Sequence, residues 1–106
     1  MKILKIGVKR GDVSLVEIDG TLESMHEVVG GYIEPCAPLE LKVCDIELFA
    51  NEEGLLAGLE PNENLYPFFF VGTLFMCGVE GDELVGLKDG EVDFCQRWLK
   101  RLIGCE

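Results

Sequence analysis

Glu17-Ile-Asp-Gly-Thr-Leu-Glu-Ser-Met-His-Glu-Val-Val-Gly-Gly-Tyr-Ile-Glu34 is the stretch that decides the fold, because it joins the end of one strand, a helix and the start of another strand. Thr21 suits the N-cap of that helix, since its hydroxyl can accept a hydrogen bond from an unpaired N–H of the first turn. Gly30 and Gly31 predict the helix end, because glycine adopts the left-handed backbone conformation without a steric clash. Between these ends, apolar residues recur at helical spacing and predict one buried stripe: Leu22, Met25 and Val29.

The flanking segments alternate between apolar and polar residues, as the strands of a half-buried sheet do. Residues 2–9 and 13–19 predict the two strands of a hairpin, joined by a tight turn. Residues 32–36 restart an extended segment after the helix. Residues 41–50 predict another strand, with a β-bulge near Asp45 because the apolar positions change phase there.

The second half of the chain continues the sheet and ends in a helix. A turn at 51–54, with its glycine, predicts a short returning strand at 55–59. Residues 71–79, in the most apolar part of the chain, predict the central strand, and 84–87 a short last strand. Residues 89–103 predict an amphipathic helix with the following apolar face: Val92, Cys95, Trp98 (or Leu99) and Leu102.

The predicted fold is therefore a single α+β domain over residues 1–106. Its sheet is mostly antiparallel, because too few strands are separated by helices to require a doubly wound parallel sheet. A short helix follows the first hairpin, and a longer amphipathic helix lies at the C-terminus. A chain of 106 residues is long enough for one hydrophobic core but not for two.

The net charge of −11 is unevenly distributed along the chain. Four of the nine cations lie in the first ten residues and three more near the C-terminus, whereas sixteen acids and one base, Lys42, occupy the region between Gly11 and Leu87. Binding to the phosphates of a nucleic acid requires a basic surface. We therefore expect no direct binding of nucleic acid. A protein that normally binds nucleic acid is still a possible partner.

The sequence contains no membrane segment, metal motif or catalytic set that can be named. The longest apolar run, residues 68–78, is about half of the roughly 20 residues that a membrane helix needs. The five cysteines include no Cys-x-x-Cys pair, so we expect reduced thiols, no metal and no cofactor. His26 is the only imidazole, and no nucleophile can be assigned to it. We expect a cytoplasmic protein without enzymatic activity.

Six short motifs follow one another along the chain: Ile18-Asp-Gly-Thr-Leu-Glu23, Val29-Gly-Gly-Tyr-Ile-Glu34, Asn51-Glu-Glu-Gly54, Pro61-Asn62, Val71-Gly-Thr73 and Gly78-Val79. In this order they resemble the bacterial and phage family known as domain of unknown function 3846. The resemblance extends from Lys2 to about Leu102, with departures at residues 35–38 and 68–70. The family name implies no activity, and the frequent setting of the family in phages and mobile elements implies no more than a dispensable or host-directed role.

The polar residues of these motifs suggest a pocket for a nucleotide-like small molecule. Tyrosine offers a stacking face and a hydroxyl, asparagine offers a donor and an acceptor, and glycine allows close backbone approach. This mixture suits a nucleobase or ribose, with Arg10 or Lys42 available for an anionic group. The alternative is ordinary turn chemistry, because asparagine is routine in turns. The candidate residues are Tyr32, Glu34, Asn51, Glu52, Asn62, Thr73, Gly30 and Gly31.

Two further features concern protein partners. The acids in the middle of the chain can imitate a phosphate backbone, or they can simply keep the protein soluble. The run Phe68, Phe69 and Phe70 predicts a subunit contact, because phenylalanines on both faces of a strand must be covered. We therefore expect a homo-oligomer.

The leading functional hypothesis is a non-enzymatic binding module of phage or mobile-element type, which sequesters a nucleotide-derived small molecule in host-defence evasion. The alternative is an acidic, DNA-mimic-like inhibitor of a host DNA-binding or defence protein. The two differ in their partner, since the first requires a small molecule and the second a protein.

Overall fold

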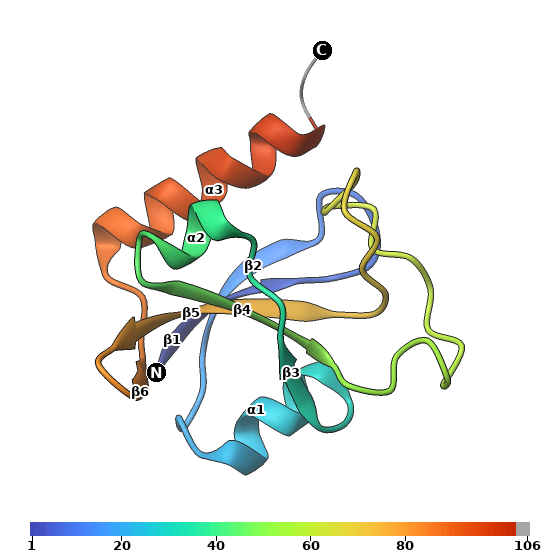
Figure 1. Ribbon diagram of the computed structural model, residues 1–106, viewed down its shortest axis with the longest axis horizontal. Helices are drawn as coiled ribbons and strands as arrows, with labels where there is room; N and C mark the ends of the chain where they lie inside the picture. The colour runs from blue at the N-terminus through green and yellow to red at the C-terminus, as the bar shows by residue number, and fades with distance from the viewer. Residues whose placement is uncertain (104–106) are drawn as a thin grey trace.

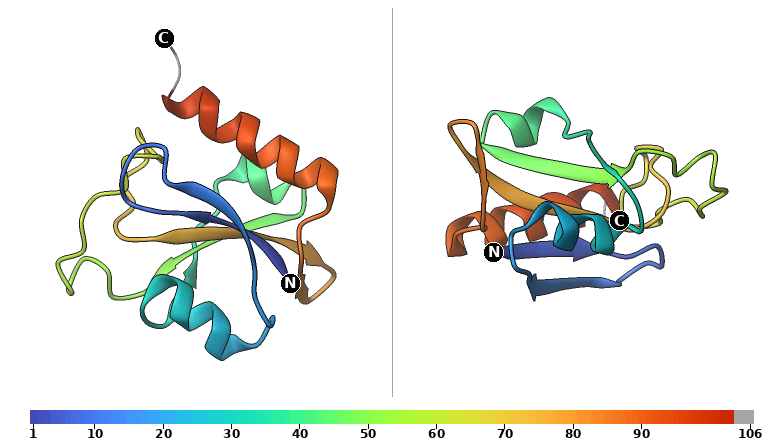
Figure 2. Two further views of the ribbon diagram at one scale, coloured as in Figure 1. Left: turned by 180° about the vertical axis from the view of Figure 1, so that it is seen from behind. Right: turned by 90° about the horizontal axis from the view of Figure 1, so that it is seen from below.

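The computed structural model describes residues 1–103, whose strands form one sheet with helices on both of its faces (Figures 1 and 2). The strands are β1 (Lys2–Ile6), β2 (Val13–Glu17), β3 (Ile33–Pro35), β4 (Ile46–Asn51), β5 (Leu74–Glu80) and β6 (Glu83–Val85). The helices are α1 (Leu22–Val29), α2 (Leu39–Lys42) and α3 (Asp89–Ile103). The predicted α+β class, with a short helix after the first hairpin and a longer C-terminal helix, is confirmed.

β5 lies at the centre of the sheet, as the sequence predicts. The strand order is β2-β1-β5-β4-β3, and β6 pairs with β5 beside this path. All the strand pairs of the described residues are antiparallel. Met76 of β5 lies opposite both Leu4 of β1 and Leu48 of β4, so the three central strands share one register across the core.

One face of the sheet is covered by α2 and α3 (Figure 1). Leu4, Leu48 and Met76 belong to this side and are fully buried. At the start of α3, Glu91 Oε1 accepts a hydrogen bond from the Lys88 N–H at 2.9 Å and satisfies a donor that the helix leaves unpaired. The predicted apolar face of α3 is confirmed, and both alternatives for its third position are buried: Cys95, Trp98 and Leu99.

α1 covers the opposite face, and its ends are as predicted. The Thr21 hydroxyl accepts a hydrogen bond from the Ser24 N–H at 3.1 Å, and a φ of 80° at Gly30 ends the helix. Met25 and Val29 are buried against the sheet, as predicted. Leu22 was expected to be buried with them. Instead it is 58 % exposed, at the first position of the helix.

Residues 39–45 do not belong to a strand, contrary to the prediction for 41–50. They form α2 and a turn, and β4 begins only at Ile46. Pro38 precedes α2 with a φ of −65°, a value that the proline ring imposes and that suits a helix start. The change of phase at Asp45 reflects its positive φ of 57°, so it marks a turn rather than a β-bulge.

Residues 52–73 form one long loop between β4 and β5, which projects beyond one end of the sheet (Figure 1). The returning strand predicted at 55–59 is wrong, because these residues form successive turns. The turns are closed by local backbone hydrogen bonds, such as the one from the Leu59 N–H to the Gly54 carbonyl at 3.0 Å. A segment that pairs with itself in this way has no hydrogen bonds left for a sheet partner.

Two buried asparagines hold the long loop against the turn between β1 and β2. The Asn62 amide donates to the carbonyls of Ile6 (3.2 Å) and Gly72 (2.8 Å). The Asn64 side chain donates to two carbonyls of the turn and accepts one of its N–H groups, each at 2.8 Å. These amides supply the partners that buried backbone groups require where no strand is present.

The described cysteines are free thiols, and three of them lie in protected surroundings. Burial is the main cause that raises the pKa of Cys36, Cys77 and Cys95 to about 12 in each case, and neighbouring charges add to the effect. Cys44 is exposed. Cys105, which was also expected to be a reduced thiol, lies outside the described residues.

We expect Asn62→Ala to lower the free energy of unfolding by about 2–3 kcal/mol, because two carbonyls and the Asn64 N–H lose their partner in a buried place. Urea unfolding followed by the fluorescence of Trp98, the single tryptophan, measures this change. Ser14→Ala is the control, since Ser14 is exposed on β2 and should change stability by less than about 0.5 kcal/mol. Unchanged stability of the Asn62 variant would contradict this structural role.

At about pH 8 we expect iodoacetamide to label Cys44 well before Cys36, Cys77 and Cys95, because the thiolate is the reactive form and burial keeps the other three protonated. Peptide mass spectrometry resolves the four sites and follows the labelling over time. In urea the four rates should converge. If a buried cysteine of the native protein reacted as fast as Cys44, the core around it would have to be open.

Candidate functional site

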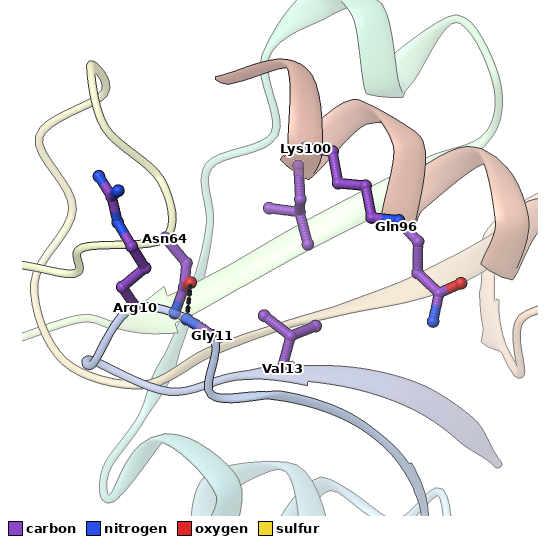
Figure 3. A pocket seen from close by; sticks show the side chains of 7 residues that line it. Arg10, Gly11, Val13, Asn64, Gln96 and Lys100 are labelled. Atoms are coloured by element: carbon purple, nitrogen blue, oxygen red, sulfur yellow. Dashed lines mark hydrogen bonds between the residues drawn. The ribbon is translucent and has the colours of Figure 1, made fainter. Parts of the chain in front are cut away.

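A hollow of about 380 Å³ lies between the turn that joins β1 to β2 and helix α3 (Figure 3). We call it the turn–helix hollow. Figure 3 shows the residues of the turn and of the long loop on one side and those of α3 on the other. The lining residues are Arg10, Gly11, Val13, Asn64, Gln96, Leu99 and Lys100.

The turn reaches this position because the long loop binds its backbone. Gly11 has a φ of 89°, a left-handed conformation that glycine adopts without strain. Its N–H donates to Asn64 Oδ1 at 2.8 Å, and the Arg10 N–H donates to Glu63 Oε1 at 2.9 Å. The two bonds fix the backbone from which the Arg10 side chain extends at the edge of the hollow.

The other wall is formed by α3, whose apolar face packs on the sheet. Cys95 and Trp98 are buried there. Gln96 and Lys100, which are neighbours one turn apart on the helix surface, lie beside that face and line the hollow. Leu99 is itself 3 % exposed, and together with the half-buried Val13 it makes part of the lining apolar.

Both cations of the turn–helix hollow lack an acidic partner. Neither Arg10 nor Lys100 takes part in an ion pair within residues 1–103. Four other cations do form ion pairs, at distances from 2.9 to 3.8 Å: Lys2 with Asp89, Lys9 with Glu60, Lys88 with Glu80, and Arg97 with Asp93.

The lining of the turn–helix hollow includes no carboxylate. Four further hollows on the described part of the protein each include at least one Asp or Glu. Two acids lie near the hollow without lining it: Asp12, which belongs to the turn itself, and Glu63, whose carboxylate accepts from the backbone N–H of Arg10. The net charge of the chain is −11, yet among these five hollows the charged lining residues of the turn–helix hollow are both cations.

This arrangement suits an anion that is joined to a partly apolar group. The Arg10 guanidinium can bind a phosphate or carboxylate through two parallel hydrogen bonds, and the Lys100 ammonium adds a point charge. Val13 and Leu99 offer apolar surface, and the Gln96 amide offers both a donor and an acceptor. The volume lies within the roughly 300–1,000 Å³ that is typical of small-molecule sites.

Five of the eight residues predicted from the sequence to form a nucleotide pocket are distributed over two other hollows, and the remaining three line none of the five hollows. Glu34, Asn51 and Glu52 line a hollow of about 490 Å³ at the base of the long loop, which we call the acid-rimmed hollow. Gly30 and Thr73 line a hollow beside α1. The structure therefore does not bring the candidate residues together in one pocket, and their role in binding stays a prediction.

Several of these residues already have structural partners. The Asn51 amide donates to the Val29 carbonyl at 3.2 Å, and its Oδ1 accepts from the Glu53 N–H at 2.8 Å. A Cβ at Gly31 would lie 2.8 Å from the Asn51 amide nitrogen, so this glycine allows the approach of Asn51. Asn62 is 4 % exposed and its amide holds the long loop.

Tyr32 and His26 form an aromatic pair on the surface near α1. Their ring centroids are 5.1 Å apart and the rings are nearly perpendicular, at 81°. Tyr32 is exposed and lines none of the five hollows described above. Its ring is open to a ligand. Asn51 lies close to the Tyr32 backbone, but its amide is hydrogen-bonded to Val29 and Glu53, and the amide of Asn62 is buried in the long loop.

Two of the three phenylalanines predicted to form a subunit contact pack on the protein itself. The ring of Phe68 lies 5.8 Å from that of Phe70 and 5.9 Å from that of Trp98. Phe68 and Phe70 are both half-buried against the core beneath α3. Phe69 is 69 % exposed and is the member of the run that faces a possible partner.

The sequence identified Arg10 as a possible ligand for an anion but did not indicate Lys100, Gln96 or Asn64. A partial signal was present, since cations gather at both ends of an otherwise acidic chain. The missing information was the contact between the long loop and the first turn, which places that turn opposite α3.

Among residues 1–103, no group of three or more His, Cys, Asp or Glu side chains is arranged to hold a metal ion. Over the same residues, no helix combines the length and the apolar character that crossing a membrane requires.

Comparisons with protein families, with curated proteins and with solved structures identify one family. No curated protein and no solved structure matches the chain. The family model described as Domain of unknown function (DUF3846) matches residues 1–102. The matched range contains all six strands and every residue that lines the turn–helix hollow. The chain therefore belongs to the family known as domain of unknown function 3846.

Proposed function

We propose that the protein is a non-enzymatic binding module that holds a small, nucleotide-derived anion in the turn–helix hollow. The observation that carries this proposal is a pair of cations, Arg10 and Lys100, that form no ion pair within residues 1–103 and lie at a hollow lined by no carboxylate. Acids outnumber bases by twenty to nine in this chain. Two cations left unpaired at one hollow are therefore available to an anion from solution.

The class of ligand follows from the two kinds of surface in the hollow. A phosphate group would lie between Arg10 and Lys100, whose side chains point apart in Figure 3 and would turn toward it to form charge-assisted hydrogen bonds. A planar base would lie against Val13 and Leu99, with the Gln96 amide near its polar edge. The long loop already fixes the backbone of the turn, so binding would require the ordering of two side chains but little ordering of the backbone.

Binding without chemical conversion agrees with the types of residue in the lining. The turn–helix hollow is lined by no imidazole, thiol or carboxylate, the side chains that most often act as general bases or nucleophiles. As its biological use, we propose the sequestration of a host nucleotide in the cytoplasm, in the setting of a phage or mobile element.

An acidic inhibitor of a DNA-binding or defence protein is the second candidate. Fifteen of the sixteen acids between Gly11 and Leu87 are exposed, the exception being the half-buried Glu47. An exposed acidic surface attracts basic proteins, and salt screens that attraction. This candidate predicts salt-sensitive binding to a protein and no stabilisation by small anions.

In thermal-shift and calorimetric titrations with linear and cyclic nucleotides, we expect a nucleotide to bind and its uncharged nucleoside to bind far more weakly. Arg10→Gln and Lys100→Gln should each weaken binding about tenfold, which corresponds to about 1.4 kcal/mol, because each removes one charge from the phosphate site. Lys42→Gln is the matched control, since Lys42 also forms no ion pair within the described residues and lines none of the five hollows.

An equal loss of affinity in the Lys42 variant would show that the overall charge, and not the turn–helix hollow, controls binding. If no nucleotide bound while a protein partner was captured in a salt-dependent manner, the second candidate would replace the first.

Glu63→Gln should have the opposite effect on the same titration. Glutamine keeps an oxygen that can accept from the Arg10 N–H but removes a negative charge beside the hollow. We expect the affinity for the nucleotide to rise about threefold, the effect of removing one screened charge. Glu83→Gln is the control, since Glu83 is exposed at the start of β6, and it should leave the affinity unchanged. A weaker affinity in the Glu63 variant would place the anion elsewhere.

A further inference from the structure

The acid-rimmed hollow carries exposed apolar side chains that the protein itself does not cover. Leu55 is 69 % exposed, Leu56 90 % and Phe69 69 %, and all three line the hollow. They belong to the long loop, which projects at the end of the sheet opposite β6 (Figure 1). Large apolar side chains gathered on one part of a surface mark interaction sites more often than scattered ones do.

The long loop presents these side chains from a fixed position. An antiparallel bridge joins Pro61 to Val71, and Leu65 is fully buried. The buried amides of Asn62 and Asn64 attach the loop to β1 and to the turn that follows it. Loops of more than roughly 15 residues without regular structure are uncommon in compact domains and usually serve a function. A fixed loop also loses little conformational entropy when a partner binds.

The edge of the hollow is acidic, and this charge indicates the chemistry of the partner. Glu34, Glu52 and Glu53 line the hollow, whose lining includes no cation. The three carboxylates are exposed and form no ion pair within residues 1–103. An apolar surface with unpaired carboxylates at its edge is complementary to an apolar side chain flanked by cations.

We propose that the acid-rimmed hollow binds a basic segment of a partner protein. A large apolar side chain of that segment contacts Leu56 and Phe69, and Lys or Arg side chains on either side of it pair with the carboxylates of Glu34, Glu52 and Glu53. A second copy of this chain fits the face less well, because a symmetric contact would bring the same carboxylates of both copies together.

Selection from a random-peptide display library, with the purified protein as bait, tests the proposal without assuming a partner. We expect the selected peptides to carry a large apolar residue flanked by Lys or Arg. Fluorescence anisotropy should show at least tenfold weaker binding of such a peptide to Leu56→Ser and to Phe69→Ser. Leu39→Ser is the matched control, since Leu39 is 73 % exposed on α2 and lies outside the hollow, and it should bind as the wild type does.

The carboxylates are tested with the same peptide. The double variant Glu52→Gln with Glu53→Gln should weaken binding several-fold at low salt and reduce its dependence on salt, whereas Glu83→Gln should change neither. Circular dichroism and thermal melting verify that every variant is folded.

Three outcomes would overturn the proposal. The first is a selection in which no peptide binds the wild type more tightly than it binds Phe69→Ser. The second is a set of Phe69-dependent peptides without cations. The third is a wild-type dimer, detected by light scattering, that dissociates in Phe69→Ser but not in Leu39→Ser, which would assign the face to a second copy of the chain.

Discussion

The hydrogen bonds between two buried asparagines and the first turn of the chain are the constraint on which both candidate binding surfaces depend. Fixing the backbone of a residue costs about 1–2 kcal/mol of conformational entropy, so the order of a loop as long as residues 52–73 must be offset by buried contacts. Asn62 and Asn64 provide part of that offset, because their amides satisfy carbonyls that no strand reaches. On its inner side the loop thereby fixes the turn opposite α3. On its outer side it presents exposed apolar side chains next to three carboxylates.

The charges near a site determine its electrostatic potential in this protein. The net charge of −11 does not indicate the potential at a particular site. The Debye length is about 8 Å at physiological ionic strength, so a charged ligand is affected mainly by groups close to it. Arg97 is neutralised by Asp93 on the next turn of the same helix, at 2.9 Å. Arg10 and Lys100 come from opposite ends of the chain and line one hollow without an acid in its lining. An acidic protein can therefore offer cations at one hollow to a small anion.

Features with a local cause could be predicted from the sequence, whereas features that depend on distant contacts could not. Thr21 and the glycine at the end of α1 are local signals, and so is the apolar face of α3; all three are confirmed. Residues 41–50 alternate like a strand on either side of Asp45, but the proline before them precedes a helix over 39–42. The candidate site fails for a related reason. The side-chain amide of Asn62 could bind a ligand or could bind backbone carbonyls of a buried loop. Only the fold determines which of these groups lie within hydrogen-bond distance of it. Arg10 and Lys100 are far apart in the chain, so no local pattern joins them.

The exposed apolar residues of the long loop have no explanation in the stability of the fold. Phe68 and Phe70 fill the space beneath α3, and the residue between them is turned outward, where Phe69 meets solvent. A polar side chain would serve equally well there, since substitutions at exposed positions usually change stability by less than about 0.5 kcal/mol. The same reasoning applies to Leu56, which is 90 % exposed. Two large apolar side chains that the core does not require, beside carboxylates that no cation neutralises, are better explained by a partner that contacts both.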